Sequence, residues 1–533
     1  MKRLLVHWAR NPFMAYEHSK GTYAFHPVFR EYLQGKFKAE SWHWQKNAYM
    51  RAAKWELHEK GKAYPTALRI ISEGGLSVLY KHSPQELRQI LRNATPVERA
   101  RNFNACALIL LAINLIASPQ DAREERDILM INLPADWEPS SEENARFFFL
   151  EALDSLPDSG MVEADLRKLL SFCKENEVKL PRDYFQGIFR GVVGQLGFYY
   201  RRSGTLLENV HTLQSIYDIC GLIIKDCDGR LWHSSAEAEL NYMQGNIDTA
   251  DEILLHFLKS PWNTIDRQQR AIIALFLYPR VALIRKTAYE FKDWKKLYKK
   301  LKAAISDDLT KTSLDMVAIH MSSLLEEPSP KQEHLIDTIN ELPEYNALRT
   351  MRQSVRHRLN LSLRKYNLIL HTTETKDPYP SANASQMSRC YDAIARIGAL
   401  QYFGKAQEAS ALLKSALHES LQDYFIMPFI EHYNILKPLL LPLASDPVYA
   451  QFLQQARKMA ITPISEKALE ETTLTPREQL IISRVRDGWT NKEIADELTV
   501  AEVTIKKHLT ELYKKFHVHS RTQLLLEIDK SQK

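Results

Sequence analysis

Hydroxyl and charged side chains recur along one face of a helix that we predict for residues 500 to 516. The apolar face of this helix consists of Val503 or Ile505 with Leu509, Leu512 and Phe516. The other face carries Glu502, Thr504, Lys506, Lys507, Thr510 and Lys514. Lysine can pair with phosphate or donate to guanine O6 and N7, and threonine can contact phosphates or thymine methyl groups. Because an α-helix fits the major groove of B-DNA, the pattern predicts contact with double-stranded DNA.

Three capping boxes mark where neighbouring helices should begin. They are Thr475-Pro476-Arg477-Glu478, Thr490-Asn491-Lys492-Glu493 and Ser520-Arg521-Thr522-Gln523. In such a box the hydroxyl accepts from the backbone N–H three residues later, and the Glu or Gln reaches back. Gly488 permits the left-handed turn that ends the first helix. The stretch therefore predicts four short helices, of which the second and third form a helix-turn-helix.

The second of these helices offers a place for a backbone phosphate. Thr490, Asn491 and the N–H groups behind them lie at the positive end of its dipole, and Lys492 adds a charge. The net charge from Glu471 to Lys533 is only +1, with 11 Lys and Arg against 10 Asp and Glu. Placement of charge, rather than its total, must therefore carry any affinity for DNA.

The motifs of this stretch resemble the LuxR/GerE-type helix-turn-helix. They are Leu474-Thr475-x-Arg477-Glu478, Gly488-x-Thr490-Asn491-Lys492-Glu493-Ile494-Ala495-x-x-Leu498, Thr504-Ile505-Lys506-x-His508-Leu509 and Tyr513-x-Lys515-Phe516-x-Val518. Ala501 makes the match closest to the MalT-like branch of large LuxR-family regulators. The resemblance covers about 55 residues and implies a sequence-specific DNA-binding regulator that pairs on two half-sites, with homo-oligomerisation and RNA polymerase contact as further expectations.

Two histidine positions each allow a structural and a functional interpretation. His508 can either pack and orient the helix or touch DNA. His517 stands where the family usually has glycine, so we expect mild backbone strain there. Together with His519 it resembles a metal pair, but further ligands are not evident and the sequence predicts no metal.

The long middle of the chain predicts an all-α fold. Ala236, Gly245, Ala250 and Leu254 recur at the same offsets as Ala395, Gly404, Ala409 and Leu413. In a helix-turn-helix repeat the glycine ends the first helix and the alanine lets the second approach closely, which resembles the tetratricopeptide repeat. Phe291 to Leu297 reads as a weaker third copy. We expect a solenoid that binds an effector or a protein partner on its concave surface, with an irregular helical bundle as the alternative.

The N-terminus is the exception to the helical pattern. Phe13 to Tyr16 and Thr22 to Phe25 predict a β-hairpin with Gly21 at positive φ, and a helix should begin at His26-Pro27. The stretch from Gly21 to Leu33 resembles the end of the winged-helix segment of MalT-like regulators. A G-x-x-x-x-G-K-[ST] phosphate loop is absent from the sequence, so neither ATP nor any other cofactor is expected.

Composition limits the remaining function classes. Apolar residues make up 45% and charged residues 26% of 533, as in ordinary globular proteins. The apolar run from Ala105 to Ile116 is too short to span a bilayer and predicts a buried core helix. Five scattered cysteines favour reduced thiols, and with no recognisable signal peptide the cytoplasm is the expected compartment.

We therefore predict four parts: a winged-helix-like remnant (1–35), a helical-repeat sensor or partner-binding region (36–460), a linker (461–473) and the DNA-binding domain (474–533). Two rival interpretations stay open. One is a helical scaffold with a vestigial DNA-binding domain, and the other is a truncated form of an ATP-dependent MalT-like activator. An enzyme is not expected, because the sequence shows no strong pattern of nucleophile and base, metal ligands or phosphate loop.

Overall fold

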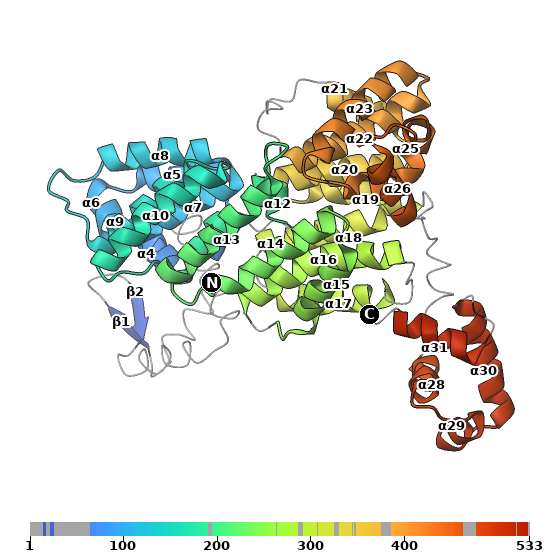
Figure 1. Cartoon of the computed structure of the whole chain (residues 1–533). Helices are drawn as coiled ribbons and strands as arrows, with labels where there is room; N and C mark the ends of the chain where they lie inside the picture. The colour runs from blue at the N-terminus through green and yellow to red at the C-terminus, as the bar shows by residue number, and fades with distance from the viewer. Residues whose placement is uncertain are drawn as a thin grey trace. The chain divides into compact units, whose positions relative to one another are not determined.

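The computed structural model is almost entirely helical (Figure 1). It describes residues 14–17, 22–25, 64–189, 194–262, 264–285, 291–305, 308–324, 330–343, 345, 348–374, 385–461, 476–516, 518 and 520–530. Strands β1 (Met14–Glu17) and β2 (Thr22–Phe25) pair antiparallel, with Met14 opposite Phe25. The predicted N-terminal hairpin is thus confirmed, whereas its turn and the helix predicted after His26 lie outside the described residues.

The chain divides into two compact units. One comprises Met1–Ile113 with Glu124–Glu138, and the other comprises Asn114–Arg123 with Pro139–Lys533. The helices up to residue 131 are α4 (Tyr64–Gly74), the 3₁₀ helix η1 (Leu76–Lys81), α5 (Pro84–Asn93), α6 (Pro96–Arg101), α7 (Phe103–Ile116) and α8 (Pro119–Ile131). The predicted core helix is α7, in which every residue from Ala105 to Leu115 is at most 2% exposed.

Capping boxes also start helices far from the C-terminal stretch. The Glu86 N–H donates to Ser83 Oγ (3.2 Å) at α5, and the Glu98 N–H donates to Thr95 Oγ1 (3.3 Å) at α6. In both cases the carboxylate accepts from the N-cap backbone, so two otherwise unpaired donors are satisfied. A capping box therefore predicts where a helix begins and says nothing of what the helix binds.

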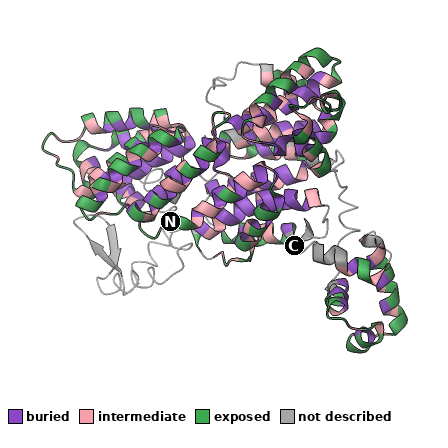
Figure 2. Ribbon diagram, in the orientation of Figure 1, coloured by how far each residue is buried: buried purple, intermediate pink, exposed green. Residues whose placement is uncertain are grey.

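A continuous helical array follows. Its elements are α9 (Ser141–Leu153), α10 (Ser159–Glu175), η2 (Arg182–Tyr184), α11 (Phe185–Phe189), α12 (Leu196–Tyr199), α13 (Leu206–Ile223), α14 (Arg230–Met243), α15 (Ile247–Lys259), α16 (Ile265–Arg285), α17 (Phe291–Ala304), α18 (Asp308–Ser322), α19 (Pro330–Glu341), α20 (Arg349–Ser362), α21 (Tyr366–Glu374), α22 (Gln386–Tyr402), α23 (Ala406–Leu421), α24 (Met427–Glu431), α25 (Tyr433–Leu440), η6 (Leu441–Leu443) and α26 (Ala450–Met459). Consecutive helices pack against each other, and their buried faces meet between them (Figure 2). In addition, α12 contacts α20 and α22, and α14 contacts α24, so segments far apart in sequence share one core.

The two segments with matching spacing form matching helix pairs. Gly245, between α14 and α15, and Gly404, between α22 and α23, have φ of 79° and 72°. The alanines and leucines at the shared offsets are at most 1% exposed. These pairs have the geometry that the repeat pattern predicts, because left-handed backbone at the helix end favours glycine. Assignment of the whole array to a tetratricopeptide-type solenoid stays a prediction.

A further helix pair has the same turn, but the spacing of small residues in the sequence did not predict it. Arg364, between α20 and α21, has φ of 56°, and the next N–H, of Lys365, donates to Asn360 O (2.8 Å). The Asn246 N–H donates to Asn241 O (2.8 Å) in the same way after Gly245. Val355 and Ile369 occupy the positions of the two alanines and are buried. Because arginine replaces glycine and branched residues replace the alanines, this repeat could not be recognised from its sequence. The turn before Phe291, the weaker copy, lies outside the described residues.

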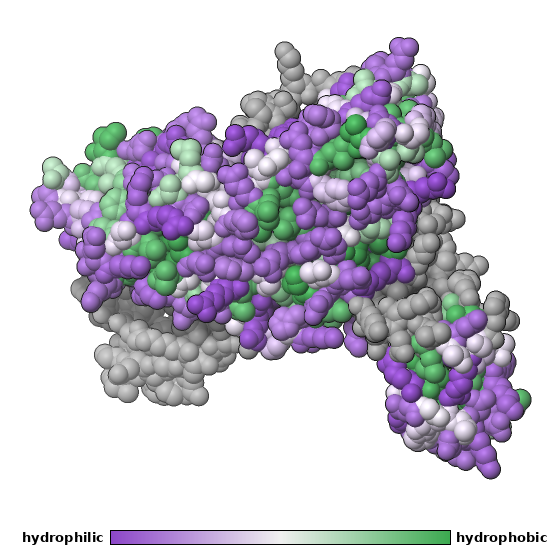
Figure 3. Space-filling model, viewed as in Figure 1, coloured by the Kyte–Doolittle hydropathy of each residue, from purple (hydrophilic) through white to green (hydrophobic). Residues whose placement is uncertain are grey.

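The surface of the described residues is that of an ordinary globular protein. In the view of Figure 3 most of it is hydrophilic, and apolar side chains form small scattered patches. Within the described ranges every helix is too short or too polar to span a bilayer. The cysteines are free, and four of the five are buried, as Cys106 illustrates; burial raises the pKa of its thiol to about 12.

Candidate nucleic-acid interface

Four helices at the C-terminus enclose a small core of their own. They are α28 (Pro476–Arg486), α29 (Asn491–Glu497), α30 (Glu502–Lys515) and α31 (Arg521–Lys530). The buried members of this core are Ile481, Ile482, Val485, Ile494, Ala495, Ile505, Leu509, Leu512 and Leu524. All four predicted helices are confirmed, and the core fixes which face of each one reaches solvent.

The two turns between the first three helices use left-handed residues. Gly488 follows α28 with φ of 84°, as predicted. Thr499, between α29 and α30, has φ of 52°, and the following Val500 N–H donates to Ala495 O (3.0 Å). A β-branched residue in this region is strained, so the tight turn is held by the packing around it. Nothing in the sequence pattern marked Thr499 for this role.

Helix α30 turns polar side chains outward, and the structure decides between its two apolar candidates. Ile505 is fully buried, whereas Val503 is 70% exposed. Exposed beside Val503 are Glu502, Lys506, Lys507 and Thr510, while Thr504 and His508 are half-buried. The side chain of Lys514 lies outside the described residues. The outer face is therefore basic and hydroxyl-bearing, and it includes an apolar side chain that the sequence assigned only as an alternative.

Lys506 forms an ion pair with Glu502 on this face. Its ammonium lies 2.8 Å from Glu502 Oε1, one helical turn earlier. The hydrogen bond to Lys506 lowers the pKa of Glu502, and Lys492 of the preceding helix adds to the effect. Glu502 is thus within electrostatic reach of both Lys506 and Lys492. Because this pair is exposed, Lys506 can exchange it for a DNA partner at little cost.

The start of α29 is a complete capping box. The Glu493 N–H donates to Thr490 Oγ1 (3.3 Å), and Glu493 Oε2 accepts from the Thr490 N–H (2.6 Å) and hydroxyl (2.7 Å). These hydrogen bonds lower the pKa of Glu493, so the box stays ionised at neutral pH. The Thr490 hydroxyl is therefore engaged inside the cap, and a phosphate here would meet the Asn491 and Lys492 side of the helix start.

Arg521, at the start of α31, supports the same corner. Its Nη1 donates to Asn491 Oδ1 (3.1 Å), and its Nη2 donates to the Trp489 carbonyl. The guanidinium therefore fixes the turn that leads into α29 and brings another positive charge beside Asn491. In the sequence Arg521 is recognisable only as part of a capping box, because a contact between residues 30 positions apart leaves no trace in local spacing.

Arg484 of α28 forms a bidentate ion pair with α29. Two of its nitrogens meet the carboxylate of Glu497 at 2.7 and 2.5 Å, and its guanidinium lies 5.0 Å from the centre of the Trp489 ring. The bidentate hydrogen bond lowers the pKa of Glu497. A planar fork of this kind fixes orientation as well as distance. This contact fixes the orientation of α29 relative to α28.

The remaining predicted chemistry concerns metals and cofactors. His517 and His519 lie outside the described residues. Among the residues that the structure does describe, His, Cys, Asp and Glu side chains form no group of three that could hold a metal ion. Arg484 and Arg521 fix the turns and helices around this surface.

A hydroxyl–imidazole–carboxylate chain occurs elsewhere, in the helical array. His357 Nδ1 lies 2.7 Å from Asp392 Oδ1, and its Nε2 lies 3.0 Å from Thr372 Oγ1. The Thr372 hydroxyl also lies 2.8 Å from the carbonyl of Leu368 in its own helix, to which it donates. A hydroxyl that donates its proton to the helix backbone is not activated by the imidazole. The chain ties α20, α21 and α22 together, and sequence spacing did not reveal it.

Comparison with known proteins concerns this same C-terminal stretch. Residues 472–527 match the model of the bacterial regulatory proteins of the LuxR family, also named GerE. Transcriptional regulatory protein ComA of Bacillus subtilis is 34% identical over 128 residues, which are 24% of this chain and 54% of ComA. LiaR of the same species is 43% identical over 58 residues, or 11% of this chain and 28% of LiaR. The CsgBAC operon transcriptional regulatory protein of Escherichia coli is 46% identical over 54 residues, or 10% of this chain and 25% of that protein.

The chain thus spans about half the length of ComA and about a quarter of the other two relatives. No solved structure gives a significant match. The family match covers the four helices, their common core and the exposed basic face of α30. Residues 472–527 are therefore a helix-turn-helix domain of the LuxR family of bacterial regulatory proteins.

Proposed function

We propose that the protein is a transcription regulator that binds specific double-stranded DNA through α30. The observation that carries this proposal is the division of α30 into a buried side, with Ile505, and an exposed basic side, with Lys506 and Lys507. A helix anchored by its own core and exposed along its basic face can enter the major groove without rearrangement. The relatives that share the domain are named as transcriptional regulatory proteins.

We assign base and backbone contacts to different residues. Lys506, Lys507, Thr510 and the exposed Val503 face the bases, where lysine donates to guanine and an apolar side chain packs on a thymine methyl. Lys492 and Asn491, steadied by Arg521, hold a phosphate at the start of α29. Thr504, His508 and Lys514 complete the predicted surface. Two such domains on adjacent half-sites would raise the effective concentration of each, so we propose that the protein acts as a homodimer or oligomer in the cytoplasm.

The remaining chain is proposed to govern the DNA-binding domain. We divide it into a remnant (1–35), a helical sensor or partner-binding region (36–460) and a linker (461–473), with the DNA-binding domain in 474–533. The array offers buried helix pairs with a cavity among them, which suits an effector. A contact with RNA polymerase would convert occupancy of the DNA into a change in transcription.

Selection of binding sites from random DNA with the full-length protein tests the proposal. We expect enrichment of a short motif, repeated at a spacing near one helical turn if the protein binds as a pair. Recovery of DNA without any enriched motif at low salt would contradict the proposal and favour a scaffold with a vestigial domain. The same protein with Lys506→Ala and Lys507→Ala serves as the matched control, since both side chains are exposed and their loss should spare the fold.

A further inference from the structure

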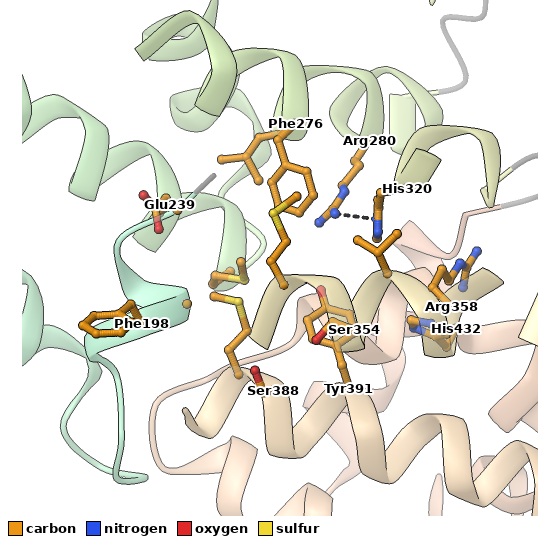
Figure 4. Close-up of a pocket in the computed structure, with 17 residues that line it drawn as sticks. Phe198, Glu239, Phe276, Arg280, His320, Ser354, Arg358, Ser388, Tyr391 and His432 are labelled. Carbon is orange, nitrogen blue, oxygen red and sulfur yellow. Dashed lines mark hydrogen bonds between the residues drawn. The ribbon is translucent and has the colours of Figure 1, made fainter. Parts of the chain in front are cut away.

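A cavity lies inside the helical array, within the second compact unit. Side chains from α12, α14, α16, α18, α20 and α22 line it, and His432 closes it between α24 and α25 (Figure 4). Its space for the centre of a water-sized sphere is about 90 Å³. Since one water needs about 10–15 Å³ on this measure, the cavity holds roughly six to nine waters, or a small organic molecule with that number of heavy atoms.

One side of the cavity is basic. Arg280, His320, Arg358 and His432 gather there in Figure 4, whereas Glu239 lies on the opposite side. Arg280 is 2% exposed, and its charge is met by Glu431, whose Oε1 accepts from Nη1 at 3.2 Å. The two carboxylate oxygens of Glu431 also accept from the hydroxyls of Tyr242 (2.6 Å) and Tyr391 (3.1 Å). Glu431 thus accepts hydrogen bonds from Arg280, Tyr242 and Tyr391.

Arg358 has no equivalent carboxylate. Among the described residues nothing forms a hydrogen bond or an ion pair with its guanidinium, and its buried Nε has no acceptor. Burial and the charge of Arg280 lower its pKa, although Glu431 acts in the opposite direction. Glu431 is the only carboxylate described beside the two arginines, so the charge of the half-buried Arg358 has no carboxylate partner of its own in the described part of the chain.

One ring nitrogen of His320, on the same side of the cavity, also lacks a hydrogen-bond partner among the described residues. Its Nε2 accepts from Arg280 Nη2 (2.5 Å), and burial together with the two arginines holds its pKa well below the ordinary value. The neutral ring must therefore carry its proton on Nδ1. Nδ1 is buried, and in the described part of the chain no acceptor lies within hydrogen-bond distance of it. A buried donor without an acceptor is costly, so an oxygen supplied from the cavity would be stabilised.

Much of the remaining lining is apolar, although Ser354, Ser388 and Tyr391 also line the cavity. Met243, Met351 and Met387 line the cavity with Phe198 and Phe276. The Phe276 ring lies 3.7 Å from the guanidinium carbon of Arg280 and covers it. Methionine side chains adapt to the shape of an apolar group. A ligand should therefore combine one small anionic end with an apolar body.

Glu239 sets the orientation of such a ligand. Its two oxygens accept from the backbone N–H groups of Gln195 (2.9 Å) and Leu196 (3.0 Å), which fixes the carboxylate at its end of the cavity. When Glu239 is ionised, an anion is disfavoured beside it and favoured at the arginine side. In the described lining only Arg358 lacks a carboxylate partner, which suits a monoanion better than a phosphate dianion.

We propose that this cavity binds a small organic carboxylate, with its anionic end at Arg280, His320 and Arg358 and its apolar body against the methionines and Phe276. Binding itself requires only the array. Its meaning as a signal rests on the proposed function, in which the array governs the DNA-binding domain.

The test uses the full-length protein with benzoate and hexanoate as probes, benzamide and hexanamide as neutral controls of the same size, and inorganic phosphate. Thermal unfolding and calorimetry measure binding. We expect the carboxylates to raise Tm in a concentration-dependent manner, and the amides and phosphate to leave it unchanged. Arg358→Gln should weaken carboxylate binding by on the order of tenfold or more, because a charge-assisted contact is lost. Arg356→Gln, on the same helix but outside the cavity, should bind as the wild type does.

A second variant locates the site independently of charge. Met387→Trp fills the cavity and should abolish binding of both carboxylates while Arg280 and Arg358 are retained. Absence of any carboxylate effect at millimolar concentration, equal binding of amides, or unchanged binding in Arg358→Gln and Met387→Trp would overturn the proposal. DNA binding by the same preparations is measured in parallel. Specific DNA binding without carboxylate binding would contradict only the cavity proposal. Carboxylate binding without specific DNA binding would contradict only the proposed function.

Discussion

Val503 and Ile505 lie two residues apart on α30 and have opposite surroundings. Residues two apart on a helix are separated by about 200° around its axis, so only one of the two can lie on the apolar face with Leu509, Leu512 and Phe516. The structure buries Ile505 completely and leaves Val503 70% exposed. Ile505 lies on the same side of the helix as Leu509 and Leu512 and packs with them in the core of the four helices, so the spacing of these residues is enough to choose between the two.

This contrast gives a paired prediction. Ile505→Ala should destabilise the C-terminal domain by about 2–5 kcal/mol, the usual cost of truncating a buried isoleucine. Val503→Ala should leave stability unchanged and weaken binding to the selected DNA site. Hydrogen exchange at the amides of α30 in the full-length protein measures the first effect, and a binding titration measures the second. Equal loss of protection in the two variants would show that Val503 is part of the core.

Lys506 and Lys492 are predicted to act differently although both are lysines near Glu502. Lys506→Ala should weaken specific binding and change the base preference, because it reads base edges. Lys492→Ala should weaken binding to all sequences and reduce the salt slope by about one, because it neutralises a phosphate. Titrations at several salt concentrations separate the two roles. Equal losses on specific and random DNA for both variants would contradict this assignment.

At the scale of elements, local chemistry predicted helix ends better than helix partners. The box at Thr490 and Glu493 and the left-handed Gly488 were predictable because each acts within four residues. Arg521 and Arg484 were not, because their partners lie 30 and 13 residues away. The repeat was recognised where glycine stands at the turn and missed where Arg364 adopts the same backbone conformation.

The contact between α14 and the start of α12 predicts a pH effect. Burial raises the pKa of Glu239 from its ordinary 4.5 to about 7. A carboxyl whose folded pKa is raised favours folding below its unfolded pKa, and this stability is lost as pH rises through the folded value. The array should therefore lose about 2 kcal/mol between about pH 5.5 and about pH 7.5 from this group alone.

Denaturant unfolding at the two pH values measures that loss in the wild type and in Glu239→Gln. The amide cannot ionise, so the variant should show a smaller dependence on pH. Glu237→Gln, an exposed neighbour on the same helix, is the matched control and should behave as the wild type does. An identical pH dependence in Glu239→Gln and the wild type would assign the effect to other groups.

The chain joins an array of helix pairs to a C-terminal domain that is only about a tenth of its length. The all-α class, the buried α7 and the DNA-binding domain were predictable, because helical periodicity and a motif of about 55 residues carry them. The cavity was not, since its arginines and histidines come from α16, α18, α20 and the segment around His432. Their sequence neighbours give no sign that these side chains converge.

The central claim is that this chain distinguishes one DNA sequence from others through α30. The most direct measurement compares the affinity of the full-length protein for its selected site with that for a scrambled duplex of equal length and composition, at physiological salt. We predict a preference on the order of a thousandfold or more, largely lost in Lys506→Ala. Equal affinity for the two duplexes, with the same dependence on salt, would contradict the account.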